Sequence, residues 1–219
     1  MDFLPVGFCG ALIAAASVTL FLEVSPYFVS GITVPAKIAA ISSGQMRPGP
    51  SFDSQRMVLD DCYVAMNSLQ LFAGPTSQRL RIAQQCASLA GGIADGAPTT
   101  AYAFLVGAVA AAALGDIAAM NADLGRSQRL APREAWLAQA RATLGEAQLE
   151  NLDDSTRAGH TRDLGLLASS AKYGGAIVTR YLDDPQFRER LEVILGRLSD
   201  SEVRGFLSLA DAALQARGS

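Results

Sequence analysis

Lysine and histidine are scarce in this sequence. Lysine occurs only at Lys37 and Lys172 and histidine only at His160, so arginine supplies every other positive charge. The arginines form no basic tract, and the formal net charge of the 219-residue chain is -3. Because proteins that bind nucleic acid present a concentrated basic surface, we expect no nucleic-acid partner. The shortage of lysine beside abundant alanine is typical of proteins from GC-rich bacterial genomes.

Patterns that bind metals or phosphates are also missing. Zinc sites need several cysteine or histidine ligands at short spacings, whereas the single histidine stands alone and the three cysteines are far apart. The glycine pairs at residues 91–92 and 174–175 lack the lysine that follows in a phosphate-binding loop. We interpret the second pair as a point where two helices approach closely. The sequence predicts no metal and no cofactor.

One short motif has the form of a catalytic one. Residues 169–172, Ser-Ser-Ala-Lys, match the S-x-x-K pattern in which the lysine of penicillin-recognising acyl enzymes helps to activate the serine. The companion motifs S-D-N and K-T-G are absent, and those enzymes need a mixed sheet, whereas no strand-type alternation occurs in this chain. We interpret the motif as part of a helix with a solvated lysine and expect the protein not to be an enzyme.

Other charged residues fit structural roles. Acidic pairs occur at residues 60–61, 153–154 and 183–184, and we interpret them as groups at helix ends that cap helices and complement helix dipoles. His160 is expected in a polar loop. A basic patch near the end of the chain is either a solvated face or a docking site, and it consists of Arg188, Arg190 and Arg197.

What the sequence does contain is a long uncharged run. No charged side chain occurs between Asp2 and Glu23. About 20 residues at 1.5 Å per residue cover the roughly 30 Å of a bilayer's hydrocarbon core, so residues 1–23 are predicted to form a single transmembrane anchor. A cleaved signal peptide would need positive charge at its start and a small-residue cleavage site near its end. A buried core helix is the alternative interpretation.

Small residues recur within this run at Gly7, Gly10 and Ala14. Small residues three or four positions apart let membrane helices approach closely, so these three are candidate contacts with a partner. The expected partners are the membrane itself and other protein subunits, in particular integral membrane proteins. The expected location is a bacterial inner membrane.

Residues 24–53 form a connecting or interfacial segment. Its prolines and glycines are expected to prevent a long helix, and they are Pro26, Gly31, Pro35, Gly44, Pro48, Gly49 and Pro50. Tyr27, Phe28 and the stretch 38–41 are nevertheless too apolar for a solvated linker. They lie at the membrane interface, where tyrosine is favoured, or contact a partner, or pack on the chain's own domain. Tyr27 and Phe28 are therefore candidate partner-binding residues.

Two signals bear on the side of the membrane that the body faces, and they oppose each other. Positive residues mark the cytoplasmic side, and Lys37 and Arg47 follow the anchor, which weakly favours a cytoplasmic body. Cys62 and Cys86 could instead form a disulfide across a helical hairpin in an oxidising compartment, or they are two small buried hydrophobic residues. We favour a periplasmic body.

Residues 54–219 carry apolar side chains at the spacing of one helix face. The pattern predicts helices over residues 57–72, 77–89, 100–114, 117–130, 134–149, 162–182, 186–198 and 202–216. A loop is expected at 150–159. The helix over 100–114 is almost wholly apolar, so we expect it to be buried on most sides. The fold class is predicted to be all-α, with antiparallel helical pairs following the transmembrane helix.

Residues 101–132 resemble a tetratricopeptide repeat, in which two helices pack through small residues and end at a proline. The matching positions are Phe104, Ala108, Gly115, Asp116, Leu124, Ser127 and Pro132. Gly107, Ala111 and Met120 depart from the pattern, and neighbouring segments match it loosely, although Trp136 opens the next pair as tryptophan often does. The resemblance implies a TPR-like α-solenoid over residues 54–219.

Such stacks present an extended surface that binds other proteins. The resemblance therefore implies a membrane-tethered scaffold or accessory subunit of a bacterial inner-membrane complex, without catalysis of its own. The alternative is an auxiliary subunit that directly supports a polysaccharide-synthesising, transport or energy-converting membrane enzyme.

Overall fold

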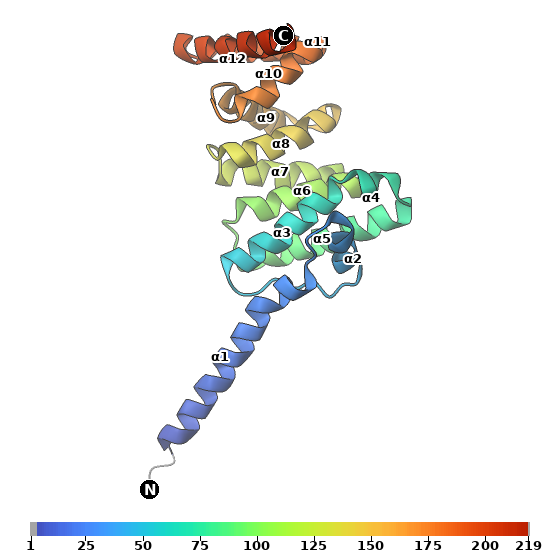
Figure 1. The fold of residues 1–219 in the computed structure, drawn as a ribbon, viewed down its shortest axis with the longest axis vertical. Helices are drawn as coiled ribbons and strands as arrows, with labels where there is room; N and C mark the ends of the chain where they lie inside the picture. The colour runs from blue at the N-terminus through green and yellow to red at the C-terminus, as the bar shows by residue number, and fades with distance from the viewer. Residues whose placement is uncertain (1–3, 219) are drawn as a thin grey trace. The chain divides into compact units, whose positions relative to one another are not determined.

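The computed structural model describes residues 4–218, and it describes the side chains of residues 11–217. Within these residues the chain forms twelve α-helices and one short 3₁₀ helix, without a strand (Figure 1). The all-α prediction is confirmed. The chain divides into two compact units, which we call unit 1 (Met1–Met120) and unit 2 (Asn121–Ser219). The boundaries predicted at residues 23 and 53 both fall inside unit 1 and stay a prediction.

Helix α1 (Leu4–Val29) extends beyond the predicted anchor and includes Pro26. A proline inside a helix removes one backbone hydrogen bond and usually kinks or ends the helix. Pro26 lies in the last turn, where its carbonyl still accepts a hydrogen bond from the Ser30 amide at 2.7 Å. The expected break at Pro26 is therefore wrong, because the helix continues through Val29.

Helix α2 (Val34–Ser42) lies inside the segment that was expected to connect the anchor to the body. The Thr33 side chain caps it, and Pro35 occupies the first turn, where a missing N–H group costs no intrahelical bond. Three apolar residues of α2 are buried: Ile38, Ala40 and Ile41. Since α2 packs against later helices of unit 1, this part of the segment packs on the chain's own domain.

Unit 1 also contains α3 (Phe52–Met66), α4 (Leu69–Ala73), α5 (Thr76–Gly96) and α6 (Ala101–Leu114). Helix α6 packs against α3 and α5, and all residues from 101 to 111 are buried, as its apolar composition predicts. Helix α5 continues through Gly91 and Gly92, where an end was expected. Each glycine costs a helix about 1 kcal/mol relative to alanine, and packing against α6 along the helix offsets that cost.

Helix α7 (Ile117–Leu130) crosses the division between the units, and its bounds match the prediction. The other helices of unit 2 are α8 (Ala135–Ala147), η1 (Leu149–Asn151), α9 (Asp154–Ala168), α10 (Gly174–Asp183), α11 (Pro185–Leu195) and α12 (Asp200–Gly218). Helices α8 to α12 share one apolar core. Its fully buried large side chains include Phe187, Leu191 and Phe206.

Two predictions for unit 2 are wrong. Residues 154–159 belong to α9 rather than to a loop, and the helix predicted over 162–182 is interrupted between Ala168 and Gly174. Asp153 starts α9 by accepting a hydrogen bond from the Thr156 amide at 2.8 Å. The first turns of α9 are polar, so they lack the apolar spacing on which the prediction depended. The acidic pair at residues 153–154 nevertheless provides the cap at which α9 starts, as predicted for that pair.

The cap predicted for the acidic pair at residues 183–184 is also confirmed, and a further cap starts α12. Asp184, directly before Pro185, accepts a hydrogen bond from the Phe187 amide at 3.0 Å. Ser199 and Glu202 form a reciprocal capping box, in which the Glu202 carboxylate accepts from the Ser199 amide at 2.9 Å and the Ser199 hydroxyl accepts from the Glu202 amide at 3.4 Å. These contacts fix where α11 and α12 begin.

Candidate functional site

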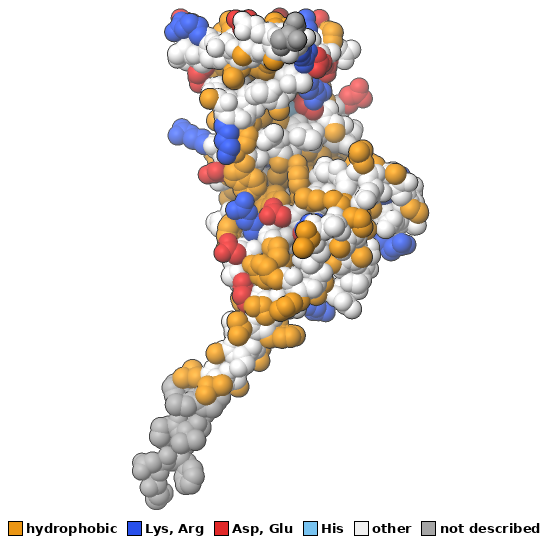
Figure 2. Space-filling model, viewed as in Figure 1, with side chains coloured by type: hydrophobic (Ala, Val, Ile, Leu, Met, Phe, Trp, Pro, Cys, Tyr) orange, Lys and Arg blue, Asp and Glu red, His pale blue; other side chains and the backbone are white. Residues whose placement is uncertain are grey.

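The apolar surface of α1 is the first candidate site. Residues 11–29 are long and apolar enough to cross a membrane, and only 6% of that stretch is buried. Ile13, Leu20 and Phe21 each expose 63–68% of their surface, and Figure 2 shows hydrophobic side chains along this part of the helix. A core helix of a globular protein would bury these side chains. Within this chain, therefore, α1 is not a core helix.

The small residues of α1 that were expected to contact a partner are only partly described. Ala14 lies on α1 and is exposed. Gly7 and Gly10 belong to the helix, but they lie outside the residues whose side-chain surroundings are described. Their predicted role in partner contact stays a prediction.

The end of α1 is fastened to the body of unit 1 by a carboxylate. Glu23 accepts hydrogen bonds from the Ser51 amide at 3.0 Å and from the Ser51 hydroxyl. Gly49 lies so close that a Cβ added there would be 2.8 Å from the Glu23 Cα atom. A side chain at position 49 would therefore separate the two segments, which is why a glycine is required at this approach.

A second polar contact fastens the segment that follows α1. Asp61, in the middle of α3, is 1% exposed and forms an ion pair with Lys37 of α2. Its other carboxylate oxygen accepts a hydrogen bond from the Ser30 hydroxyl at 2.5 Å. The capping role predicted for residues 60–61 is wrong, because these residues lie inside a helix and bind side chains of other segments. We call the contacts of Glu23 and Asp61 the anchor junction.

Asp60, the neighbour of Asp61, binds a tyrosine of the core. The Tyr102 hydroxyl of α6 donates to the Asp60 carboxylate at 2.7 Å. Burial raises the pKa of Tyr102, and the hydrogen bond and negative charge of Asp60 raise it further. Tyr102 therefore stays a neutral hydrogen-bond donor, which holds α6 against α3.

Apolar side chains next to the anchor junction are exposed. Tyr27 is 50% exposed, Phe28 is 85% exposed, and Ile32, between α1 and α2, is fully exposed. Of the three alternatives for this segment, packing on the chain's own domain is therefore wrong for Tyr27 and Phe28. The same alternative is correct for the stretch 38–41. A membrane interface or a partner remains as the surface that could cover them.

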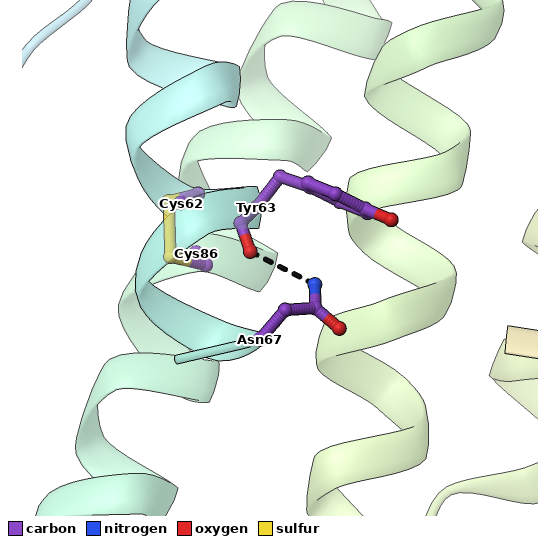
Figure 3. Close-up of a disulfide and its surroundings, with 4 residues drawn as sticks. All are labelled: Cys62, Tyr63, Asn67 and Cys86. Carbon is purple, nitrogen blue, oxygen red and sulfur yellow. Dashed lines mark hydrogen bonds between the residues drawn. A yellow bond between two sulfur atoms is a disulfide. The ribbon is translucent and has the colours of Figure 1, made fainter. Parts of the chain in front are cut away.

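Cys62 and Cys86 form a disulfide that joins α3 to α5 (Figure 3). Their Cα atoms are 5.6 Å apart, and both residues are fully buried. The disulfide interpretation of these cysteines is therefore confirmed, and the interpretation as two unpaired buried residues is wrong. It closes a loop of sequence separation 24, which in the chain-entropy model stabilises the folded state by about 3 kcal/mol.

The residues of the tetratricopeptide-like pattern lie in α6, in the turn that follows it, in α7 and just after α7. Gly115 adopts a left-handed conformation with φ of 76° at the end of α6. Asp116 then caps the start of α7 by accepting a hydrogen bond from the Ala119 amide at 3.0 Å. Phe104, Ala108, Leu124 and Ser127 are buried, whereas Pro132 and Trp136 are exposed.

Unit 2 contains a buried ion pair that sequence reasoning missed. Arg141 of α8 is 0% exposed and donates from Nε and Nη2 to the Asp163 carboxylate of α9, at 2.9 and 2.6 Å. It also donates to the carbonyls of Ser127 and Ala131. Arg141 follows Leu137 and Ala138 at helical spacing, so its position on the apolar face of α8 was the available signal.

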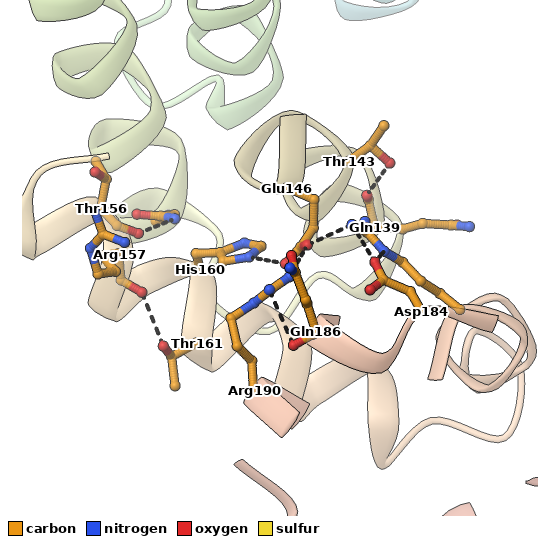
Figure 4. Close-up of polar contacts among 12 residues, drawn as sticks. Gln139, Thr143, Glu146, Thr156, Arg157, His160, Thr161, Asp184, Gln186 and Arg190 are labelled. Carbon is orange, nitrogen blue, oxygen red and sulfur yellow. Dashed lines mark hydrogen bonds and ion pairs between the residues drawn. The ribbon is translucent and has the colours of Figure 1, made fainter. Parts of the chain in front are cut away.

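A second charged cluster surrounds Glu146 of α8 (Figure 4). Its carboxylate contacts His160 Nε2 at 2.7 Å, Arg180 at 2.9 Å and Arg190 at 2.7 Å. Burial alone would raise the pKa of Glu146, but the hydrogen bond from His160 and the charges of His160 and both arginines lower it. A group at position 145 larger than glycine would collide with the His160 ring. The expected loop position of His160 is wrong, since it is a buried residue of α9.

A groove lies between α9 and α11, with a volume of about 290 Å³. Its apolar lining comes from Leu149, Leu164, Val193 and Ile194. Its polar lining comes from Arg157, His160, Thr161, Arg190 and Arg197. We call this feature the α9–α11 groove. It includes two of the three arginines of the predicted basic patch.

The third arginine of that patch has a structural role. Arg188 donates to the carbonyls of Tyr181 and Leu182, both at 2.9 Å. These carbonyls belong to the last turn of α10, where unpaired C=O groups need donors. Arg188 therefore ties α10 to α11 and is not part of an open basic face.

The S-x-x-K motif and the second glycine pair also have local contacts. Ser169 ends α9 and donates to the Leu166 carbonyl at 3.1 Å. The Lys172 ammonium group lies 5.2 Å from the centre of the Tyr173 ring. Gly174 lies where an added Cβ would be 2.9 Å from a Leu209 methyl group, which agrees with the predicted close approach of two helices.

Comparison with protein-family models, with curated proteins and with solved structures finds no match for this chain. The class of the protein therefore rests on the fold alone: the residues that the structure describes are all-helical, and they include one exposed apolar helix long enough to span a membrane.

Proposed function

We propose that this protein is a membrane-anchored, non-catalytic binding subunit that attaches a helical body to a membrane and holds other proteins there. The observation that carries the proposal is α1, whose apolar side chains are exposed over a membrane-spanning length. Leaving so much apolar surface in water would be costly, at about 25 cal/mol for each Å². A bilayer covers that surface, and the body then lies at the bilayer surface.

The anchor junction supports this proposal. Glu23 and Asp61 connect the end of α1 and the following segment to α3 and to the loop before it. A flexible linker would let the body move freely relative to the membrane. These part-buried polar contacts instead hold unit 1 close to the end of the anchor, as a subunit that presents a binding surface to membrane neighbours requires.

We propose that residues 54–219 form a degenerate TPR-like stack. The turn at Gly115 and Asp116 and the burial of Phe104, Ala108 and Leu124 support this assignment. The binding surface of the protein would then be the exposed faces of successive helices.

We further propose that the membrane is a bacterial inner membrane and that the body is periplasmic. The disulfide between Cys62 and Cys86 supports this side, because structural disulfides persist in oxidising compartments such as the periplasm. A thiol-labelling experiment tests it. In a Cys9→Ser background, cells are quenched with acid and the protein is denatured before alkylation, because both cysteines are fully buried in the folded protein. Both thiols should then resist alkylation unless a reductant is added first, and labelling of both without a reductant would contradict a periplasmic body.

Membrane extraction tests the anchor. The full-length protein should stay in the membrane pellet after washing with alkaline carbonate and should dissolve only in detergent. A matched variant, Ile13→Arg with Val18→Arg, places two charges on the exposed apolar surface and should increase the fraction released, because an arginine at the centre of a span costs about 2.5–3.5 kcal/mol on insertion scales. Release of the wild type by carbonate would contradict the anchor.

Affinity purification in mild detergent tests the binding role. The protein should recover membrane subunits in a fixed ratio that survives gel filtration. Recovery of a free monomer from membranes that retain all other complexes would contradict the role as a subunit, even if the anchor were correct.

A further inference from the structure

The α9–α11 groove has an apolar lining that is exposed mainly at Val193, whereas Leu164 and Ile194 at its floor are buried. Helix α11 buries Phe187, Leu191 and Ile194, yet Val193 is 61% exposed and lines the groove. The volume of about 290 Å³ is at the lower end of the range of small-ligand pockets. It suits the insertion of one large apolar side chain from a partner.

The polar lining of the groove is positively charged. Arg157 and Arg197 make no ion pair with any residue that the structure describes. Arg190 shares the Glu146 carboxylate with Arg180, so that single negative charge is already divided between two arginines. No acidic residue is among the described residues that line the groove. A concave surface with one sign of charge attracts groups of the opposite sign.

We propose that the α9–α11 groove binds an acidic, amphipathic helical segment of a partner protein. An apolar side chain of that helix would enter beside Val193, and carboxylates one turn before and after it would reach Arg157 and Arg197. Residues three or four apart share one face of a helix, which is the spacing by which amphipathic helices are recognised in grooves. Arginine pairs with carboxylates through two parallel hydrogen bonds, which adds geometric specificity. The inference rests on the proposed binding function and names the chemistry of its partner.

Synthetic peptides test this inference on the full-length protein in nanodiscs of zwitterionic phosphatidylcholine. The acidic probe is a labelled helical peptide with one leucine flanked by glutamates at i-4, i-3, i+3 and i+4. The basic probe has lysine in place of each glutamate, and a third probe has the acidic composition in scrambled order. Fluorescence anisotropy should show binding of the acidic probe, with the basic and scrambled probes at least about tenfold weaker.

A charge exchange identifies the groove as the binding site. The variant Arg157→Glu with Arg197→Glu should lose the acidic probe by at least about tenfold and gain the basic probe. Arg157 Nη2 also donates a hydrogen bond to the Leu152 carbonyl at 2.9 Å, so its substitution could weaken the start of α9. A loss of acidic-probe binding alone could come from that weakening, whereas a gain of basic-probe binding reports the reversed charge of the groove. The control Arg133→Glu with Arg204→Glu makes the same change in net charge at exposed positions outside the groove and should preserve acidic-probe binding.

Three outcomes would overturn the inference. The first is a wild type that does not bind the acidic probe more tightly than the basic and scrambled probes. The second is a control variant that loses the acidic probe as strongly as the groove variant. Binding of vesicles that contain phosphatidylglycerol, lost in the groove variant while peptides do not bind, would assign the groove to anionic lipid instead. Each outcome is independent of carbonate extraction, so failure of the groove is distinguishable from failure of the anchor.

Discussion

Unit 1 and unit 2 are built from the same kind of helix, but different forces hold their interiors together. Unit 1 has the nearly all-apolar helix α6 at its centre and a disulfide between α3 and α5. Unit 2 has a buried arginine, Arg141, paired with Asp163, and a carboxylate, Glu146, among basic side chains. Unit 1 also has the ion pair of Lys37 with the buried Asp61, but only unit 1 has a disulfide, because unit 2 contains no cysteine. The stability of unit 1 should therefore depend on redox conditions, and that of unit 2 on charge and pH alone.

The largest effect is expected in unit 2. Asp163→Ala removes the partner of Arg141 and leaves a charge buried without compensation, which destabilises a protein by about 3–5 kcal/mol. Hydrogen exchange with mass spectrometry should show faster exchange in peptides from α8 and α9 and unchanged exchange in α3 and α5. The double variant Arg141→Met with Asp163→Leu removes both charges and should cost much less. Equal losses in the two variants would show that packing, and not the charge, is responsible.

Loss of the disulfide should be the next largest effect, and it should appear in unit 1. Cys62→Ala with Cys86→Ala, in a Cys9→Ser background, should lower the free energy of unfolding by about 2–4 kcal/mol. Peptides from α3 and α5 should exchange faster, whereas those from α8 and α9 should not change. A reductant should reproduce the effect in the parent protein and have none in the variant. If the reductant instead affected both units equally, the two units would unfold together.

The anchor junction should show an intermediate effect within unit 1. Lys37→Met leaves the Asp61 carboxylate buried with Ser30 as a remaining partner, and loss of a hydrogen bond to a charged group costs about 1.5–3 kcal/mol. Exchange should increase in peptides covering residues 24–42. The control Lys37→Met with Asp61→Leu removes the unpaired charge and should recover part of the stability. No recovery in this double variant would contradict a role for the buried charge.

The structure also shows which features the sequence can predict. Helices α6 and α7 were predicted closely because Gly115 and Asp116 mark their junction and because an apolar helix must be buried. The buried charges were not predicted, since Asp61 pairs with Lys37 and Arg141 with Asp163 across sequence separations of 24 and 22. The position of Arg141 beside Leu137 and Ala138 on the apolar face of α8 is a sign of burial, but the sequence does not show which distant residue is its partner. For the same reason the α9–α11 groove, assembled from three separate segments, has no local signature.

The smallest effect is expected in the pH dependence of stability, which should change in unit 2 and not in unit 1. Because the pKa of Glu146 is lower in the folded state than its usual value of 4.5, the unfolded chain takes up a proton at this carboxyl more readily. The stabilising contribution of Glu146 is therefore fully present above about pH 4.5 and is lost as the pH falls through the lower folded-state pKa. Glu146→Gln should remove this contribution, so the difference in melting temperature between the parent protein and the variant should shrink below pH 4.5.

The control Glu189→Gln removes an exposed carboxyl of α11 and should retain the pH dependence of the parent protein. Exchange in α8 and α9 at acid pH should report the change while α3 and α5 do not, and a change of equal size in unit 1 would show that the pH dependence is a property of the whole chain rather than of the Glu146 cluster.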